Sequence, residues 1–154
     1  MRRDSRLSDV LHVLLHMAGH KWPATSQALA QAIDTNPVVV RRIMAGLREQ
    51  GYVRSEKGHG GGWSLACDLA KVTLRDVYDA LGGPPLLALG NREDASGCLV
   101  GQVVHEALDD AFEQAEALLL SRLGKVTLSR LNTDLHKRLI ARGGAHRLET
   151  VHAS

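Results

Sequence analysis

The chain has 154 residues, of which 44% are apolar, and its formal net charge is +2. This length fits one domain, or a small domain with an accessory element, and the apolar content is sufficient for a packed core. No apolar run is long enough to span a membrane, and the periodic N-terminal segment differs from the hydrophobic region of a signal peptide. Two cysteines, Cys67 and Cys98, do not suggest a disulfide framework, so we expect cytoplasmic residence.

The first expected element is an amphipathic helix over residues 7–18, with apolar residues at helical spacing. His12, His16 and His20 lie four residues apart along this segment. A metal site would need a third or fourth ligand held nearby, and Asp9 is the only local candidate. His20 also lies beyond the expected end of the helix. We therefore predict solvated or interface histidines and assign no metal site here.

The next two elements are predicted to form a helix-turn-helix. A short helix opens at Thr25 and Ser26, and Asp34 and Thr35 make the turn into a second helix. In such a pair the first helix crosses the DNA backbone and the second enters the major groove. Hydroxyl groups at the start of the first helix are natural phosphate partners, so Thr25 and Ser26 are candidate DNA contacts. N-capping by one of them is compatible with that role.

The second helix has well-marked ends. Asn36 is a good N-cap, Pro37 suits the first helical position, and Gly51 follows the last turn. Apolar residues at helical spacing predict a buried stripe between positions 40 and 47. The opposite side is cationic and only thinly apolar, and it carries Val38, Arg41, Arg42, Ala45 and Arg48.

A glycine-rich hairpin follows this helix directly. Residues 52–55 and 63–66 are short strand candidates, and residues 56–62 between them are mostly glycine and charge. Glycines permit positive φ and let the backbone approach another surface closely. A phosphate-binding P-loop would need a Lys-Ser/Thr pair and a following helix, and both are missing. A plain turn does not explain the charged residues, so we predict a DNA-touching wing with Lys57, His59, Gly60 and Gly61 in its loop.

Positive charge is concentrated where the second helix meets the hairpin. Residues 41–57 contain five Lys/Arg (Arg41, Arg42, Arg48, Arg54 and Lys57) and two Asp/Glu (Glu49 and Glu56), although the net charge of the chain is small. A phosphate-contacting surface requires such a concentration. A solvated charged face would give the same count, so charge alone does not decide between the two.

Three further helices are expected downstream. Thr73 and Asp76 form a capping-box-like start for a helix that ends before residues 82–85, Gly-Gly-Pro-Pro. A long helix over residues 99–123 carries a small and aliphatic stripe, and it would span on the order of 37 Å. A second copy of the same helix is the economical cover for this stripe, which predicts a twofold dimer. Residues 127–139 are expected to form a final short helix.

These elements predict a mostly α fold with a small β-hairpin wing. The expected parts are a winged helix-turn-helix domain at 1–83, a flexible loop at 84–98, a dimerisation helix with a final short helix at 99–140, and a disordered tail at 141–154.

Helix, wing, linker helix and long helix occur in the order found in the Rrf2 family of bacterial winged-helix repressors, which includes the IscR, NsrR and CymR types. The chain resembles this family over roughly residues 6–140. The most specific motif is LREQGYVRSEKGHGGGWSLA leading into TLRDVYDALGG, and CLVG begins the long helix. The resemblance implies a homodimer that binds a pseudo-palindromic operator, usually as a repressor.

By position, the resemblance places four residues on the groove-facing helix. It places Lys57 where a basic wing residue of the family enters the minor groove. His59 replaces a proline common between the wing glycines, so the loop geometry is expected to differ. Arginine on the groove-facing helix would favour guanine through O6 and N7. The four helix residues are Pro37, Val38, Arg41 and Arg42.

Iron–sulfur members of the family carry three cysteines in the loop before the dimer helix. This chain has only the last of them, Cys98, with Leu86 and Arg92 near the other two places. One thiolate is too few to hold a cluster and Cys67 is expected on the far side of the wing, so we expect no cofactor. Cys98 precedes a helix, where amide dipoles favour a thiolate. It is either a sensor thiol or a small residue buried at the interface. Sensing of a small ligand between the linker helix and the dimer helix is the other open alternative, and the sequence names no ligand.

An enzyme is not expected, because the chain offers no catalytic constellation. Cys98 and His105 are the only near pair, and they stand about 10.5 Å apart along one helix, too far for direct proton transfer. The expected partners are double-stranded DNA and a second copy of the chain, with no membrane. The alternative is a winged-helix protein-interaction module without specific DNA binding.

Overall fold

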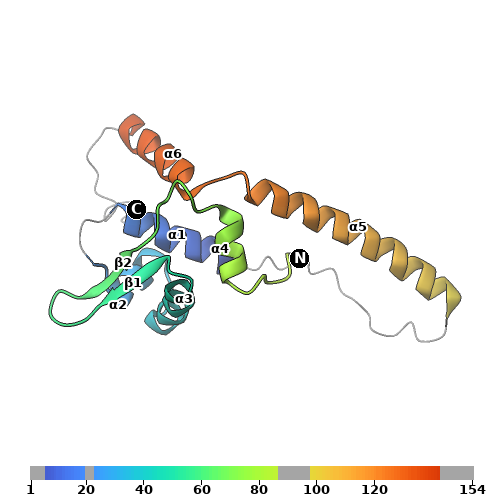
Figure 1. Ribbon diagram of the computed structural model, residues 1–154, viewed down its shortest axis with the longest axis horizontal. Helices are drawn as coiled ribbons and strands as arrows, with labels where there is room; N and C mark the ends of the chain where they lie inside the picture. Colours follow the sequence, from blue (N-terminus) through green and yellow to red (C-terminus); the bar gives the residue numbers. More distant parts are fainter. Residues whose placement is uncertain (1–5, 20–22, 87–97, 143–154) are drawn as a thin grey trace.

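The computed structural model describes residues 6–19, 23–86 and 98–142, which form six helices and one two-stranded antiparallel sheet. All elements except one helix gather in a single body, and the remaining helix, α5, extends away from it (Figure 1). In chain order the elements are α1 (Arg6–Ala18), α2 (Ser26–Ala32), α3 (Pro37–Glu49), β1 (Val53–Glu56), β2 (Gly62–Leu65), α4 (Leu74–Ala80), α5 (Leu99–Leu123) and α6 (Leu128–Ala141).

The hydrophobic core of the body is centred on α1 and α3. The apolar stripe predicted for the second helix of the helix-turn-helix is confirmed, because Val40, Met44 and Leu47 are buried. On α1, Val10 and Leu14 are buried in the same cluster. Complete burial of each such side chain contributes roughly 1.5–3 kcal/mol, so this cluster anchors the helix-turn-helix to α1.

The two strands form the predicted hairpin, but each lies one residue away from its predicted limits. The register pairs Val53 with Leu65 and Glu56 with Gly62. Tyr52 was expected in the first strand, yet its backbone N–H donates to the carbonyl of Leu47 at the end of α3. The N–H of Tyr52 therefore closes the helix, and the ladder starts one residue later.

The edge of β2 that faces away from β1 is paired with the segment that leads into α2. The N–H of Ala24 donates to the carbonyl of Trp63 over 2.9 Å, and the N–H of Trp63 donates back to Ala24 over 2.8 Å. A Cβ on Gly62 would lie 2.6 Å from the carbonyl oxygen of Ala24. The close backbone approach expected of the wing glycines thus occurs at Gly62, within the molecule.

The linker helix α4 and the start of α6 meet through their N-terminal caps. Thr73 and Asp76 form the predicted capping box of α4. Thr73 also pairs with Thr127, and the N–H of Leu128 donates to the carbonyl of Val72 over 2.9 Å. Leu128 is fully buried in the core cluster, so α6 packs on the body that contains α1. This long-range contact determines where the chain returns after α5.

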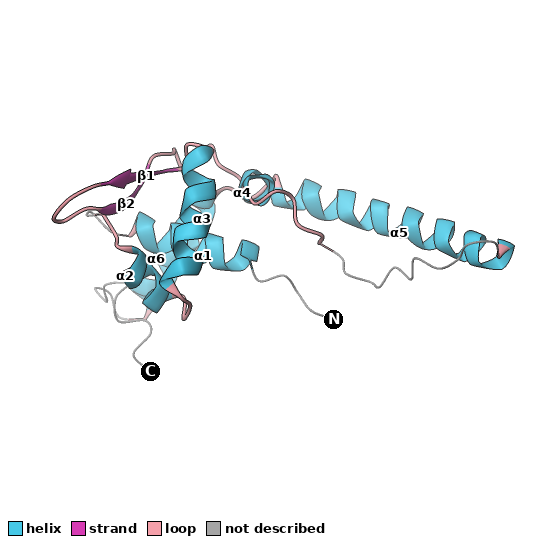
Figure 2. Ribbon diagram, turned by 90° about the horizontal axis from the view of Figure 1, so that it is seen from below, coloured by secondary structure: helices cyan, strands magenta, loops and turns pink. Residues whose placement is uncertain are grey.

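The long helix α5 has no buried residue and leaves the body in both views (Figures 1 and 2). Its apolar side chains are exposed, with Leu99 77% and Val103 66% accessible. Residues 87–97 of the loop predicted over residues 84–98 lie outside the described residues, as do residues 143–154 of the predicted tail. Among the helices that the structure describes, none is long and apolar enough to cross a membrane.

The histidines of α1 differ from the prediction. His16 was expected to be solvated or at an interface, but it is buried at 7% exposure and its Nε2 lies 3.1 Å from Nε2 of His12. His12 itself is exposed. The prediction for His16 was wrong because His16 lies on the face of α1 that packs into the core, beside the buried Val13 and Met17, while His12 is exposed.

Candidate nucleic-acid interface

The start of α3 is capped as predicted. The N–H of Val38 donates to Oδ1 of Asn36 over 2.8 Å, and Pro37 occupies the first turn. Asp34 adopts φ 52°, which makes the tight turn between α2 and α3. An aspartate tolerates this left-handed conformation better than most side chains. The cap and the turn together leave the first turns of α3 accessible at the surface.

The exposed face of α3 is cationic and also apolar. Arg41 and Arg42 are exposed, and Val38 and Val39 are 52% and 42% accessible. Val39 was not among the predicted contacts. Three consecutive valines were the available signal, because only Val40 is needed for the buried stripe. Exposed aliphatic groups beside arginines suit a major groove that presents thymine methyl groups next to hydrogen-bonding base edges.

The basic side chains of this region differ in whether they form an ion pair. Arg54 on β1 pairs with Glu56 over 3.4 Å, so its charge is partly neutralised. Within the described residues, Arg41, Arg42 and Lys57 form no ion pair. The available positive charge is therefore carried by α3 and by the loop of the wing.

The two hydroxyl residues at the start of α2 have different roles. Thr25 is the N-cap, and its Oγ1 accepts the N–H of Ala28 at 3.1 Å. Ser26 instead accepts a hydrogen bond from the indole Nε1 of Trp63 at 3.0 Å. N-capping by one of the pair is confirmed. The link from Ser26 to the wing was not predicted, because the two residues lie 37 positions apart in the sequence.

The loop of the wing contains the predicted residues 57–61. Gly58 and Gly60 have positive φ, and a Cβ on either would meet open space. A Cβ on Gly61 would lie 2.3 Å from the carbonyl oxygen of Glu56, so the turn itself requires this glycine. Lys57 and His59 are exposed.

The wing and α3 are directly connected in space. Tyr52 joins the end of α3 to β1, and α3 packs against β1. In Figure 1, α2, α3 and the hairpin lie together on the side of the body away from the far end of α5. The elements that carry the predicted helix and wing residues are thus neighbours in the body.

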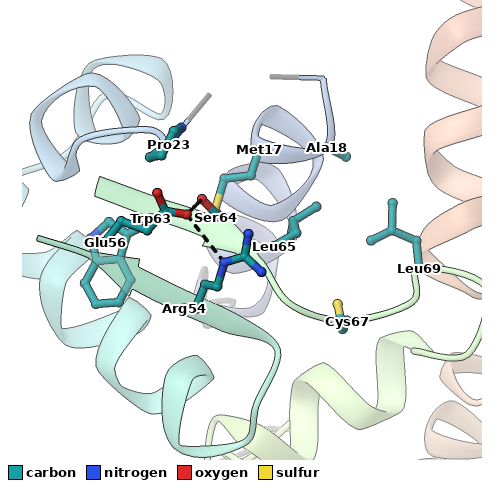
Figure 3. Close-up of a pocket in the computed structure, with 10 residues that line it drawn as sticks. All are labelled: Met17, Ala18, Pro23, Arg54, Glu56, Trp63, Ser64, Leu65, Cys67 and Leu69. Carbon is teal, nitrogen blue, oxygen red and sulfur yellow. Dashed lines mark hydrogen bonds and ion pairs between the residues drawn. The ribbon is translucent and has the colours of Figure 1, made fainter. Parts of the chain in front are cut away.

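A pocket of about 510 Å³ lies beside the hairpin, between β2, the end of α1 and the segment after β2 (Figure 3). Arg54 and Glu56 form its polar side, while Leu65 and Leu69 are on its apolar side. Cys67 also lines it, and burial raises the pKa of the Cys67 thiol above its ordinary value. The neutral thiol is therefore favoured at this position.

Comparison with known proteins identifies the family. A family model described as "Rrf2: Iron-dependent Transcriptional regulator" matches residues 3–134. YwnA of Bacillus subtilis (strain 168), whose name assigns it provisionally to the HTH-type transcriptional regulators, is 30% identical over 81% of this chain and 92% of its own length. The chain belongs to the Rrf2 family.

Solved structures agree with this assignment. A protein from Lactobacillus plantarum, titled provisionally as a transcriptional regulator, has a TM-score of 0.72 at 27% identity and covers 90% of this chain and 95% of its own. IscR from T. potens has a TM-score of 0.67 and covers 90% of each chain, and its identity of 16% shows the fold alone. The predicted winged-helix fold with a long C-terminal helix is confirmed. This Rrf2 protein is a transcriptional regulator with a DNA-binding fold and not an enzyme.

The iron in the family description can be compared with the donors of this Rrf2 chain. The three-cysteine motif needs more thiolates than the two cysteines that the sequence contains. Cys67 lines the pocket beside the hairpin with a raised pKa, whereas Cys98 is exposed before α5. In the described ranges, no three His, Cys, Asp or Glu side chains are grouped to hold a metal. These donors do not fit an iron–sulfur cluster of the family type.

Proposed function

We propose that this chain is a cytoplasmic repressor that binds a pseudo-palindromic DNA operator as a homodimer. The observation that carries this proposal is the connection of an exposed, cationic α3 face to an exposed wing. Arg41, Arg42 and Lys57 are accessible and make no ion pair within the part of the chain that is described. Such residues are available for phosphate and base contacts in a way that Arg54, paired with Glu56, is not.

Each element of this surface has a proposed role on DNA. Arg41 and Arg42 read guanine in the major groove, where Pro37 and Val38 make the closest backbone and apolar contacts. The hydroxyl of Thr25 and the first N–H groups of α2 contact phosphate, while Ser26 holds the wing in place. The wing residues that lie along the minor groove are Lys57, His59, Gly60 and Gly61.

The homodimer is supported by the exposed apolar stripe of α5. Val100, Val104 and Leu108 are 72%, 53% and 49% accessible, and no residue of α5 is buried. A contiguous apolar face of this kind marks an interaction surface in a water-exposed helix. A second α5 offers the same length and the same stripe, and a twofold pair would present two α3 helices to the two halves of a palindrome.

The direct test is selection of bound fragments from genomic DNA, followed by shift assays on the selected site. We expect one enriched palindromic sequence, and we expect its affinity to fall steeply with rising salt, because phosphate contacts release counterions. Failure to enrich any sequence, together with capture of a protein partner, would favour the alternative of a winged-helix protein-interaction module.

We propose that the regulator works without an iron–sulfur cluster, and that Cys98 supplies thiol-based sensing. Cys98 is the N-cap residue of α5, its side chain makes no cap hydrogen bond, and it is exposed. Peroxide should lower the operator affinity of the wild type and leave the operator affinity of Cys98→Ser unchanged. Identical responses of the two proteins would remove the sensing role and leave Cys98 as a small residue at the interface.

A further inference from the structure

Two histidine rings on α1 converge at the edge of the core. His12 and His16 are one helical turn apart, with Nε2 atoms 3.1 Å apart and ring centroids 4.8 Å apart. His16 is buried, whereas His12 is exposed, so the meeting point of the two nitrogens lies at the rim of the body. The pair is far along the chain from the wing and from Cys98, and the proposed DNA contacts do not use it.

The separation of the rings distinguishes two kinds of contact. In a straight N–H···N hydrogen bond at this length, the two ring centroids would be about 5.4 Å apart. Two imidazoles that bind one ion at ~2.0–2.1 Å, with bond angles between square-planar and tetrahedral, have nitrogens about 2.9–3.4 Å and centroids about 4.5–5.2 Å apart. The observed Nε2–Nε2 distance of 3.1 Å and the centroid distance of 4.8 Å both lie inside the ranges for two imidazoles on one ion. The two rings are therefore bent away from a straight hydrogen bond, and their separations match those of two imidazoles that face one ion.

We propose that His12 and His16 form a chelating site for one divalent transition-metal ion of the nickel, copper or zinc class. Neutral imidazole is a ligand that suits each of these ions. When the ion is bound, both Nε2 atoms coordinate it and each ring carries its proton on Nδ1. Without metal, one Nε2–H is shared between the two Nε2 atoms instead. Water completes the coordination from the exposed side of His12, because the other ring is covered by the core.

The position of the site couples it to the whole body. The helix α1 packs against α2, β2, α4 and α6. An ion that clamps one turn of α1 binds the folded chain and not the unfolded one, so it stabilises the body by mass action. Protons compete for the same nitrogens, and binding must weaken as the pH falls below the ordinary pKa range of histidine.

The test is calorimetric titration of the full chain, without an affinity tag, with Ni²⁺ at pH 7.5. His12→Gln is the informative variant because His12 is exposed and its loss leaves the core intact. His136→Gln is the matched control, since His136 is also an exposed helical histidine. His105→Gln tests the rival pair, in which Nε2 of His105 lies 3.3 Å from Asp109.

We expect one Ni²⁺ per protomer, a loss of affinity of at least about tenfold in His12→Gln, and no change in the two other variants. With Cu²⁺, electron paramagnetic resonance should show two coupled ring nitrogens in the wild type and one in His12→Gln. Absence of Ni²⁺ binding by the wild type, wild-type affinity in His12→Gln, or a loss confined to His105→Gln would overturn the site. None of these results depends on DNA binding.

Discussion

The indole N–H of Trp63 donates a 3.0 Å hydrogen bond to the hydroxyl of Ser26, so the wing is tied to the first residue of α2. Next to it, Trp63 and Ala24 exchange two backbone hydrogen bonds. The hairpin is therefore held by a side-chain bond to α2 and by backbone bonds to the segment that precedes α2. The hairpin and the helix-turn-helix are expected to move as one unit.

This relationship predicts a measurable coupling between the two side chains. Trp63→Phe removes the donor and Ser26→Ala removes the acceptor, and each should lower the free energy of unfolding by about 1 kcal/mol or more. In a double-mutant cycle measured by urea denaturation, we expect a coupling energy on the order of 1 kcal/mol. Additive effects of the two substitutions would show that the bond contributes nothing to the folded state.

Gly62 and Gly60 should respond differently to substitution by alanine. At Gly62 a Cβ would lie 2.6 Å from the carbonyl oxygen of Ala24, so the strand must move away from its partner. We expect Gly62→Ala to destabilise the fold by roughly 1–3 kcal/mol, as overpacking does, and to weaken DNA binding. Gly60→Ala meets open space and bears only the strain of its positive φ. Thermal unfolding of both variants gives the comparison, and equal losses would contradict this account of Gly62.

Arg41→Ala should relax sequence preference on DNA. If Arg41 makes a bidentate contact with guanine, its removal reduces discrimination between operator and mutated operator by about 1–3 kcal/mol. Titrations on the selected site and on a site with one guanine replaced provide the measurement. Arg130→Ala is the charge-matched control, since Arg130 is exposed on α6. Equal weakening of Arg41→Ala on operator and random DNA would reassign Arg41 to phosphate contact.

Lys57→Ala should act on affinity more than on specificity. A lysine that contacts one phosphate contributes about one unit to the slope of log affinity against log salt concentration. We expect the slope to become shallower by that amount, with the preference among sequences unchanged. Lys137→Ala on α6 removes the same charge elsewhere and should leave the slope as it is. An unchanged slope in Lys57→Ala would show that the wing loop does not contact the backbone.

The elements of the fold could be predicted because their signals are local. Asn36 and Pro37 mark the start of α3, the capping box of Thr73 and Asp76 marks the start of α4, and the periodic apolar stripe of α3 is buried as expected. The residues of the proposed interface on α3 follow from the same periodicity. Each of these signals lies within one or two turns of the position that it determines.

The contacts between elements could not be predicted in the same way. The bond from Trp63 to Ser26 and the docking of Leu128 against Val72 join residues far apart in sequence. Local patterns do not specify such pairings. The burial of His16 escaped prediction for a related reason, because a polar residue on the edge of an apolar stripe can lie on either side of the core boundary.

We propose that two chains, paired through α5, present two copies of the α3 and wing surface to one operator. Light scattering of the protein on a selected operator duplex tests it most directly. We predict two protomers per duplex for the wild type and for Ala117→Asp, whose exposed site lies away from the stripe by helical spacing. Val104→Asp places a charge in the stripe and should give monomers without tight DNA binding. A wild-type protein that binds its operator as one protomer, or a Val104→Asp variant that still binds as two, would contradict the account.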